Sequence, residues 1–197
     1  SKRIDTNCEF SKKKLSIINI KNLTTNFKKI NRCNFFIVCV PTPITLKKKP
    51  NLKPLIEACK NIGKILKKND IIVFESTVYT GITEEVCIPV LEKRSKLNYK
   101  NEEFYVCYSP ERINPGDKKH TIDKINKLIA IPNKKCEIMV KKVYKSLAKK
   151  IFFSSSIKET ETSKVIENIQ RDINIALMNE VFIFCNKSNL NFYNVLK

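Results

Sequence analysis

The first half of the chain alternates short apolar runs with stretches in which apolar residues recur at helical spacing. Phe35–Val40 is a continuous apolar run ended by prolines, which is typical of a strand buried on both faces. Apolar side chains then recur every three or four positions over residues 52–66, and Pro54 fits a first helical turn. Ile71–Phe74 is a second short apolar run. The pattern therefore predicts a strand, a helix and a second strand.

The same alternation continues along the chain. Thr83-Glu84-Glu85 predicts a helix start with acids near its positive end, and Pro89 either bends this helix or delays its start. Further strands are predicted at Phe104–Tyr108, Leu128–Ile131 and Ile151–Phe153, and a further helix at Cys136–Leu147. Residues 158–188 then carry one helical pattern without proline or glycine, which is longer than most helices.

This order of elements predicts an α/β fold with a Rossmann-like, doubly wound parallel sheet. Right-handed crossovers would place the carboxyl ends of the strands along one edge, where ligands bind in such sheets. The long helix is of the kind that bridges two domains or two subunits. We therefore predict part of a sheet-containing domain over residues 1–157 and the start of a second domain over residues 158–197.

The composition agrees with a globular protein. No run of about 18 apolar residues occurs and the first ten residues are polar, so we expect a cytoplasmic protein with no membrane partner. The eight cysteines are scattered, with no C-x-x-C pair and a single histidine, which argues against a zinc site. We expect reduced, structural cysteines, and Cys39 and Cys107 lie in apolar runs where a thiol is usually buried.

The formal net charge of +19 would ordinarily suggest a polyanion as partner. Here the lysines form short doublets and triplets spread along the chain, without one long basic stripe interleaved with aromatics. We interpret them as solvated faces and expect no nucleic-acid partner. A basic binding module without enzymatic activity remains an alternative that rests on charge alone.

Polar residues follow three of the predicted strands. Thr42 follows the first strand, Ser76 and Thr77 follow the second, and residues 109–112 follow the third. If the strands are parallel, all three sets would line one crevice. The alternative is that serine and threonine here only end strands and begin turns, which is their ordinary use.

The long helix carries a polar stripe beside its apolar surface. Lys164, Asn168 and Arg171 recur at i, i+4 and i+7 and so share one face. An ammonium and an amide held together can stabilise a developing oxyanion. A solvated stripe explains the same three residues.

Four segments together resemble, in order and spacing, the UDP-glucose/GDP-mannose dehydrogenase family. They are Val40-Pro41-Thr42-Pro43-Ile44, Glu75-Ser76-Thr77-Val78-Tyr79, Tyr108-Ser109-Pro110-Glu111-Arg112-Ile113-Asn114-Pro115-Gly116-Asp117, and Lys164 to Asn168 continuing to Asn179-Glu180. The third segment resembles the branch that acts on UDP-N-acetylhexosamines. The resemblance implies oxidation of the sugar C6 alcohol to a carboxylate in two NAD-dependent hydride transfers, through an aldehyde and a cysteine-bound thioester, without a metal. It also implies surface polysaccharide precursor synthesis and a homodimer formed through the long helix.

Site residues follow from the resemblance position by position. Thr42 and Thr77 would contact the dinucleotide, and Thr77 would also lie near the reacting water. Glu111 would serve as acid/base group in thioester hydrolysis and contact the substrate. Lys164 and Asn168 would stabilise the C6 oxyanion and hold the substrate, which Arg112 would contact as well.

The sequence also departs from the family pattern. It lacks the family's first strand with the Gly-x-Gly-x-x-Gly turn that approaches the pyrophosphate, so the resemblance implies that residues 1–157 are a partial NAD-binding domain and residues 158–197 the start of a central helical dimerisation domain. The glycine-rich segment with the nucleophilic cysteine is missing too, so we expect an internal fragment that is inactive alone. Thr80 stands where the family usually has proline, and residues 129–132 lack an expected glycine turn. The related β-hydroxyacid dehydrogenases share K-x-x-x-N for a single oxidation, but Ser109-Pro110-Glu111-Arg112 argues against that alternative.

Overall fold

A computed structural model describes residues 15–17, 22–111, 126–148 and 150–197. The chain divides into two compact units, Ser1–Glu161 and Thr162–Lys197. In the described part of the first unit, the strands form one five-stranded sheet in the order β1-β2-β3-β4-β5. Its strands are β1 (Phe35–Val38), β2 (Ile71–Phe74), β3 (Tyr105–Tyr108), β4 (Asn126–Ala130) and β5 (Lys150–Ser154).

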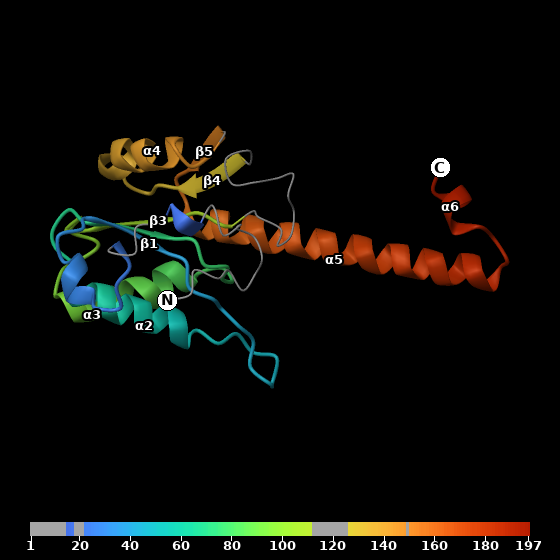
Figure 1. Cartoon of the computed structure of the whole chain (residues 1–197), viewed down its shortest axis with the longest axis horizontal. Helices are drawn as coiled ribbons and strands as arrows, with labels where there is room; N and C mark the ends of the chain where they lie inside the picture. The colour runs from blue at the N-terminus through green and yellow to red at the C-terminus, as the bar shows by residue number, and fades with distance from the viewer. Residues whose placement is uncertain (1–14, 18–21, 112–125, 149) are drawn as a thin grey trace. The chain divides into compact units, whose positions relative to one another are not determined.

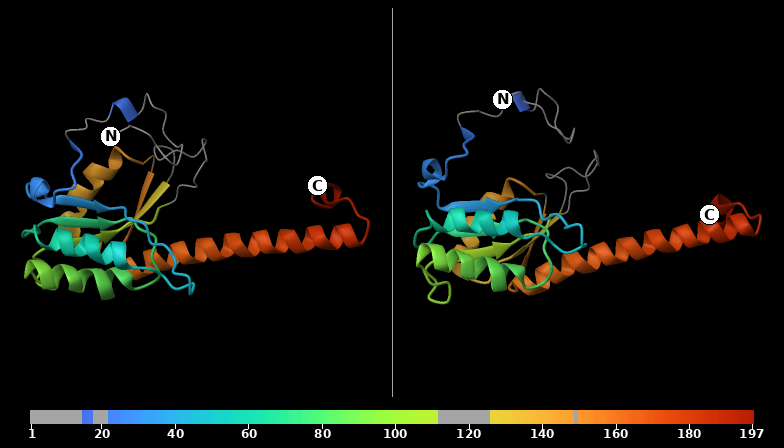
Figure 2. Two further views of the ribbon diagram at one scale, coloured as in Figure 1. Left: turned by 60° about the horizontal axis from the view of Figure 1, so that its bottom comes forward. Right: turned by 90° about the horizontal axis from the view of Figure 1, so that it is seen from below.

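Helices cover both faces of this sheet. Figure 1 shows α2 (Lys53–Gly63) and α3 (Ile88–Ser95) on one side and α4 (Glu137–Lys145) on the other. Figure 2 shows α2 and α3 lying side by side. The doubly wound α/β architecture predicted from the sequence is therefore confirmed. β2 has the predicted bounds, and the other predicted strands and helices are found with bounds shifted by a few residues.

The central strands β2 and β3 are buried on both faces, and their successive side chains point to opposite sides of the sheet. In β2, Ile72 and Phe74 belong to the core beneath α2 and α3, whereas Ile71 and Val73 belong to the core beneath α4. All four side chains are buried. This explains why β2 appears in the sequence as a continuous apolar run without polar alternation.

In one respect the sheet differs from the parallel sheet that was predicted. β1, β2 and β3 pair in parallel and so do β4 and β5, but β4 runs antiparallel to β3 through the single pair Tyr108–Ala130. The sheet thus consists of two parallel parts joined at an antiparallel seam.

The helix predicted from Thr83 begins with a wide turn. Residues of η3 (Thr83–Cys87) are π-helical, and the N–H of Ile88 donates to the carbonyl of Thr83 before α3 begins. Pro89 has no N–H and occupies the first turn of α3, where none is needed. The proline therefore delays the regular helix, one of the two outcomes predicted.

The long helix α5 (Ile157–Lys187) starts in the first unit and continues through the second. Ser156 caps its start, because Ser156 Oγ accepts from the N–H of Glu159 at 3.1 Å. Asn189 ends it in the left-handed conformation with φ 54°, and the N–H of Leu190 donates to the carbonyl of Cys185 at 2.8 Å. This is the hydrogen-bond pattern in which glycine is usual and asparagine is tolerated.

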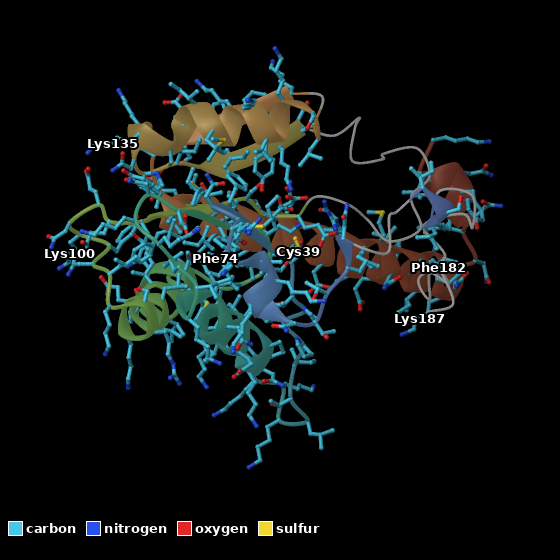
Figure 3. All side chains as sticks on the ribbon, turned by 60° about the vertical axis from the view of Figure 1, so that its left-hand side comes forward. Cys39, Phe74, Lys100, Lys135, Phe182 and Lys187 are labelled. Carbon is cyan, nitrogen blue, oxygen red and sulfur yellow. The ribbon has the colours of Figure 1, made fainter. Side chains whose placement is uncertain are left out.

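After this turn, α6 (Phe192–Val195) closes the second unit with aromatic contacts. The rings of Phe182 and Phe192 meet edge to face with centroids 5.3 Å apart, and Figure 3 labels Phe182 near the end of α5. Along α5 many large apolar side chains remain exposed, among them Ile166, Ile169, Ile173 and Leu177.

The cysteines only partly follow the expectation of burial. Cys107 is buried, with its sulfur 3.8 Å from that of Cys136, but Cys39 is exposed because it follows the last residue of β1 and lies beyond the helix-covered strands. No group of three His, Cys, Asp or Glu side chains in the described residues could hold a metal ion. Among the same residues no helix is both long and apolar enough to cross a membrane.

Candidate functional site

A cavity of about 410 Å³ opens where β1, β2 and β3 end. Its walls come from the three segments that follow these strands. Together they contribute Cys39, Val40, Pro41, Thr42, Glu75, Ser76, Thr77 and Glu111. The prediction that Thr42, Thr77 and Glu111 would line one crevice is confirmed, because the parallel order of β1, β2 and β3 places their carboxyl ends at the same edge.

Hydrogen bonds fix the two threonine-bearing segments to one another. Thr42 Oγ1 donates to the carbonyl of Thr77 at 2.6 Å, and Ser76 Oγ donates to the carbonyl of Val40 at 2.7 Å. The buried hydroxyl of Tyr108 donates to the carbonyl of Ser76 at 3.4 Å. These hydrogen bonds connect the segments after β1 and β2, so each segment helps to hold the other in the cavity wall.

Glu75 stands in this wall with both carboxylate oxygens engaged. Lys127 Nζ lies 2.5 Å from Glu75 Oε2, and Tyr144 Oη donates to Glu75 Oε1 at 2.5 Å. The side chain of Lys127 is only 4% exposed, and its ammonium lies 5.3 Å from the centroid of the Tyr144 ring. Glu75, Lys127 and Tyr144 thus form a buried polar cluster, in which each charge has a partner as burial requires.

The cluster influences the titration of its neighbours. Burial raises the pKa of the Tyr144 hydroxyl, and the nearby Glu75 carboxylate raises this pKa further. Cys39 is exposed as a residue, but its thiol is partly buried at the cavity wall, and this partial burial raises the pKa of the thiol. Glu75 and Glu111 add to the rise, and Lys127 opposes it. Cys39 is therefore mostly a neutral thiol near pH 7, which does not favour it as a nucleophile.

Glu111 is exposed at the cavity, directly after the buried Ser109 and Pro110. Ser109 Oγ donates to the carbonyl of Leu128 at 3.0 Å, so the segment after β3 is fastened to β4. Arg112, also predicted as a site residue, lies outside the described residues.

Lys164 and Asn168 belong to the second unit, on α5. Their spacing of four residues places them on one face of that helix. On the same helix, Arg171 Nη2 pairs with Glu167 Oε1 at 3.0 Å. The predicted site residues therefore fall into two groups, with Thr42, Thr77 and Glu111 around the cavity and Lys164 and Asn168 on α5.

Two features of the first unit were missed by sequence reasoning. The first is the cluster of Glu75, Lys127 and Tyr144. The sequence signal that could have revealed it is the lysine at the start of the apolar run of β4. The second is Glu161, which is completely buried and accepts hydrogen bonds from the N–H groups of Gly81 at 2.6 Å and Thr83 at 3.0 Å. The sequence signal that could have revealed Glu161 is an acidic residue at helical spacing from buried positions of the long helix.

Comparison with family models matches nearly the whole chain. Residues 9–148 match the NAD binding domain of the UDP-glucose/GDP-mannose dehydrogenase family, and residues 158–197 match the central domain of the same family. The first of these matches alone covers more than half of the chain.

Individual relatives agree with these models. The chain is 44% identical to UDP-N-acetyl-D-glucosamine 6-dehydrogenase of Salmonella typhi and 46% identical to that of Pseudomonas aeruginosa. In both cases the alignment covers 98% of this chain and 46% of the relative, so the chain spans less than half the length of these curated relatives.

A solved structure shares the fold. The UDP-D-ManNAc dehydrogenase from Pyrococcus horikoshii is 29% identical with a TM-score of 0.78, over 87% of this chain and 40% of that one. The strand-end cavity, the family models and these relatives lead to one conclusion: the chain belongs to the UDP-glucose/GDP-mannose dehydrogenase family.

Proposed function

We propose that this chain is part of an NAD-dependent UDP-N-acetylhexosamine 6-dehydrogenase, which oxidises the C6 hydroxyl of the sugar to the uronic acid for surface polysaccharide precursors. The observation that carries the proposal is the cavity where three strand ends bring Thr42, Thr77 and Glu111 together. Relatives that are 44% and 46% identical are both named UDP-N-acetyl-D-glucosamine 6-dehydrogenase, which supports the sugar class.

The cavity suits one end of a dinucleotide. It lies at the carboxyl edge of parallel strands, where such cofactors bind, and its lining offers hydroxyls and carboxylates. These groups can hydrogen-bond to ribose hydroxyls and to a carboxamide, whereas carboxylates repel phosphates. When bound, NAD supplies the acceptor for hydride. Thr42 and Thr77 would hold it, with Thr77 also near the reacting water.

The other residues would act on the sugar. Oxidation of the alcohol to the acid removes four electrons, so two NAD are reduced and one water contributes the second carboxylate oxygen. Glu111 would move the protons of that hydrolytic half. Lys164 and Asn168 would hold the substrate and stabilise negative charge on the C6 oxygen, and Arg112 would contact the substrate.

The two units suggest separate roles for the two parts of the chain. We propose that residues 1–157 contribute to the dinucleotide domain and residues 158–197 to a central helical domain. Exposed Ile166, Ile169 and Ile173 form an apolar stripe on α5 that a second copy of this chain would cover, giving a homodimer. We further propose that the protein acts in the cytoplasm, where its nucleotide-sugar substrate is made.

The product of the complete reading frame provides the test. With UDP-N-acetylglucosamine or UDP-N-acetylgalactosamine and NAD, we expect two NADH for each sugar consumed, and the better of the two sugars identifies the configuration. Turnover of small 3-hydroxy acids with one NADH, and no oxidation of any nucleotide sugar, would contradict the proposal. Salt-sensitive binding of nucleic acid without dehydrogenase activity would contradict it as well.

A separate measurement tests the homodimer. Sedimentation equilibrium of the complete protein should give twice the chain mass. The substitution Ile169→Asp together with Ile173→Asp should shift that equilibrium towards the monomer. A monomer at micromolar concentration in the unsubstituted protein would exclude this part of the proposal.

A further inference from the structure

Glu161 is the most completely buried carboxylate among the described residues, and the roles proposed above do not involve it. Its exposed fraction is 0%, and both oxygens accept hydrogen bonds from backbone N–H groups. The partners, Gly81 and Thr83, are some 80 residues earlier in the chain. All three residues lie in the first unit.

These two N–H groups belong to the turn that precedes α3. Helix starts leave N–H groups without intrahelical partners, and an anion there is favoured by the helix dipole. Gly81 occupies this turn with φ +96°, a conformation that glycine adopts without strain. Glu161 therefore satisfies the donors of a turn that no side chain within the turn caps.

The turn Gly81–Thr83 directly continues the segment that forms part of the cavity wall. Only three residues lie between Thr77 and Gly81, and Thr77 is already fastened at its carbonyl by Thr42. The buried Val78 fixes the segment between them in the core. Residues 77–83 are thus held at Thr77 by Thr42 and at Gly81 and Thr83 by Glu161, and Thr77, with its exposed side chain, is the residue of this segment that lines the cavity.

A second contact joins the same two elements. Lys158, one turn before Glu161, pairs with Glu85 through Nζ and Oε1 at 2.8 Å. Both side chains are at least half exposed, so this ion pair contributes little. The buried carboxylate, which makes two charge-assisted hydrogen bonds, is the stronger of the two links.

We propose that Glu161 is a positioning residue for dinucleotide binding: it fixes the turn Gly81–Thr83 and thereby the placement of Thr77 in the cavity wall. It acts through the backbone of residues 77–83 and not by touching a ligand. The proposal rests on the NAD-dependent function proposed above. A misplacement of about 1 Å in such a segment can cost two orders of magnitude in rate.

Hydrogen exchange on the chain itself tests the first link. Glu161→Gln keeps the size of the side chain but presents an NH₂ group to one of the two N–H donors, so one hydrogen bond is lost. We expect amide exchange in a peptide spanning residues 78–83 to accelerate at least tenfold. Glu159→Gln removes the same charge from an exposed position of the same helical turn and should leave that peptide unchanged.

Kinetics of the complete protein test the second link. Glu161→Gln should raise the KM for NAD by roughly tenfold, with a smaller change in the KM for the UDP-sugar, and Glu161→Asp should give an intermediate value because it keeps both acceptors on a shorter side chain. General destabilisation would raise neither KM selectively.

The possible failures are distinguishable. If the unsubstituted protein does not bind NAD in a fluorescence titration, the proposed function itself fails. If it binds NAD and the Glu161→Gln protein binds it equally well, the positioning role is wrong while the function stands. Should Glu161→Gln not fold, the exchange and NAD titration of Glu161→Asp decide the same question, and unchanged values there overturn the proposal.

Discussion

Lys127 and Glu75 form a buried ion pair across a strand that lies between them. Glu75 follows β2 and Lys127 lies in β4, and their side-chain atoms meet at 2.5 Å beyond the end of β3. The pair ties the two parts of the sheet together at the rim of the cavity. Its contribution is measurable because the two residues can be changed separately.

Lys127→Met should lower the free energy of unfolding by about 3 kcal/mol, because it leaves the Glu75 carboxylate largely buried without a counter-charge. Urea denaturation followed by circular dichroism measures this loss. In the double variant Lys127→Met/Glu75→Gln the uncompensated charge is gone, so we expect most of the stability to return. A loss in the double variant equal to the sum of the losses in Lys127→Met and in Glu75→Gln alone would show that the pair is not coupled.

The thiol of Cys39 should report on the charge of the cavity wall. Burial raises its pKa, and Glu75 raises it further. At a pH below the pKa, a lower pKa increases the thiolate fraction and hence the rate of alkylation. Glu75→Gln should therefore lower the pKa of Cys39 and speed its alkylation by iodoacetamide at pH 7.5.

The control for this experiment should change the alkylation rate of Cys39 in the opposite direction. Lys127 lowers the pKa of Cys39, so Lys127→Met should slow the same alkylation. Both measurements use a background with Cys8→Ser and Cys33→Ser, since Cys33 is the other exposed cysteine among the described residues. A shift of the pH–rate profile in the same direction for both variants would contradict the electrostatic explanation.

Gly63 permits the close approach of α2 and α3. A Cβ at this position would lie 2.6 Å from the Cβ of Arg94 and 3.3 Å from the carbonyl oxygen of Leu91. Alanine is ordinarily better than glycine in a helix, but here we expect Gly63→Ala to destabilise the protein by about 1–3 kcal/mol through overpacking. Arg94→Gly removes the closest contact but has its own cost in α3, so the effect of Gly63→Ala is measured against Arg94→Gly alone and should be smaller there in thermal denaturation. An increase in stability for Gly63→Ala alone would mean that the helices separate freely.

Lys164→Ala should lower kcat of the complete enzyme by about a hundredfold while changing the KM for the UDP-sugar much less. The reason is that a charge facing the C6 oxygen matters most when negative charge develops there. Steady-state kinetics at saturating NAD gives both parameters. Lys158→Ala removes a lysine from the first turn of the same helix and should leave kcat unchanged. Equal effects of Lys164→Ala on kcat and KM would remove Lys164 from the chemistry.

Glu111→Gln should allow oxidation but slow hydrolysis, because an amide cannot accept the proton of the attacking water. We expect a covalent sugar–enzyme species to accumulate in the complete protein, visible as added mass in denaturing mass spectrometry. Glu137→Gln, a change of the same kind on α4, should accumulate none. A fall in turnover without any covalent species would exclude Glu111 from the hydrolytic step.

Much of the fold could be predicted from the sequence, since strands buried on both faces have a distinctive pattern. β2, for example, was predicted with the bounds it has, because all four of its side chains are buried. The direction of β4 could not be predicted in this way. An apolar run has the same appearance in either direction, and direction depends on the connection between strands rather than on their composition.

The candidate site divides along similar lines. Thr42, Thr77 and Glu111 were predicted together because each follows a strand, and strand ends meet in a parallel arrangement. The exposure of Cys39 was missed because an apolar sequence context predicts burial, whereas this residue already lies past the end of β1. Glu161 was missed because its partners are backbone N–H groups far away in sequence. Nearly every residue type has such a group, so the residue types at the partner positions do not indicate the contact.

The antiparallel seam between β3 and β4 has a consequence for how ligand sites are located in sheets of this kind. The usual search looks at the carboxyl end of every strand, yet β4 brings a residue from its amino end, Lys127, to the cavity rim. Its carboxyl end leads away to Lys135, which pairs with Glu102 on the segment before β3, and Figure 3 shows Lys135 far from Cys39. A single reversal of strand direction thus places the amino end of β4, and not its carboxyl end, beside the cavity wall.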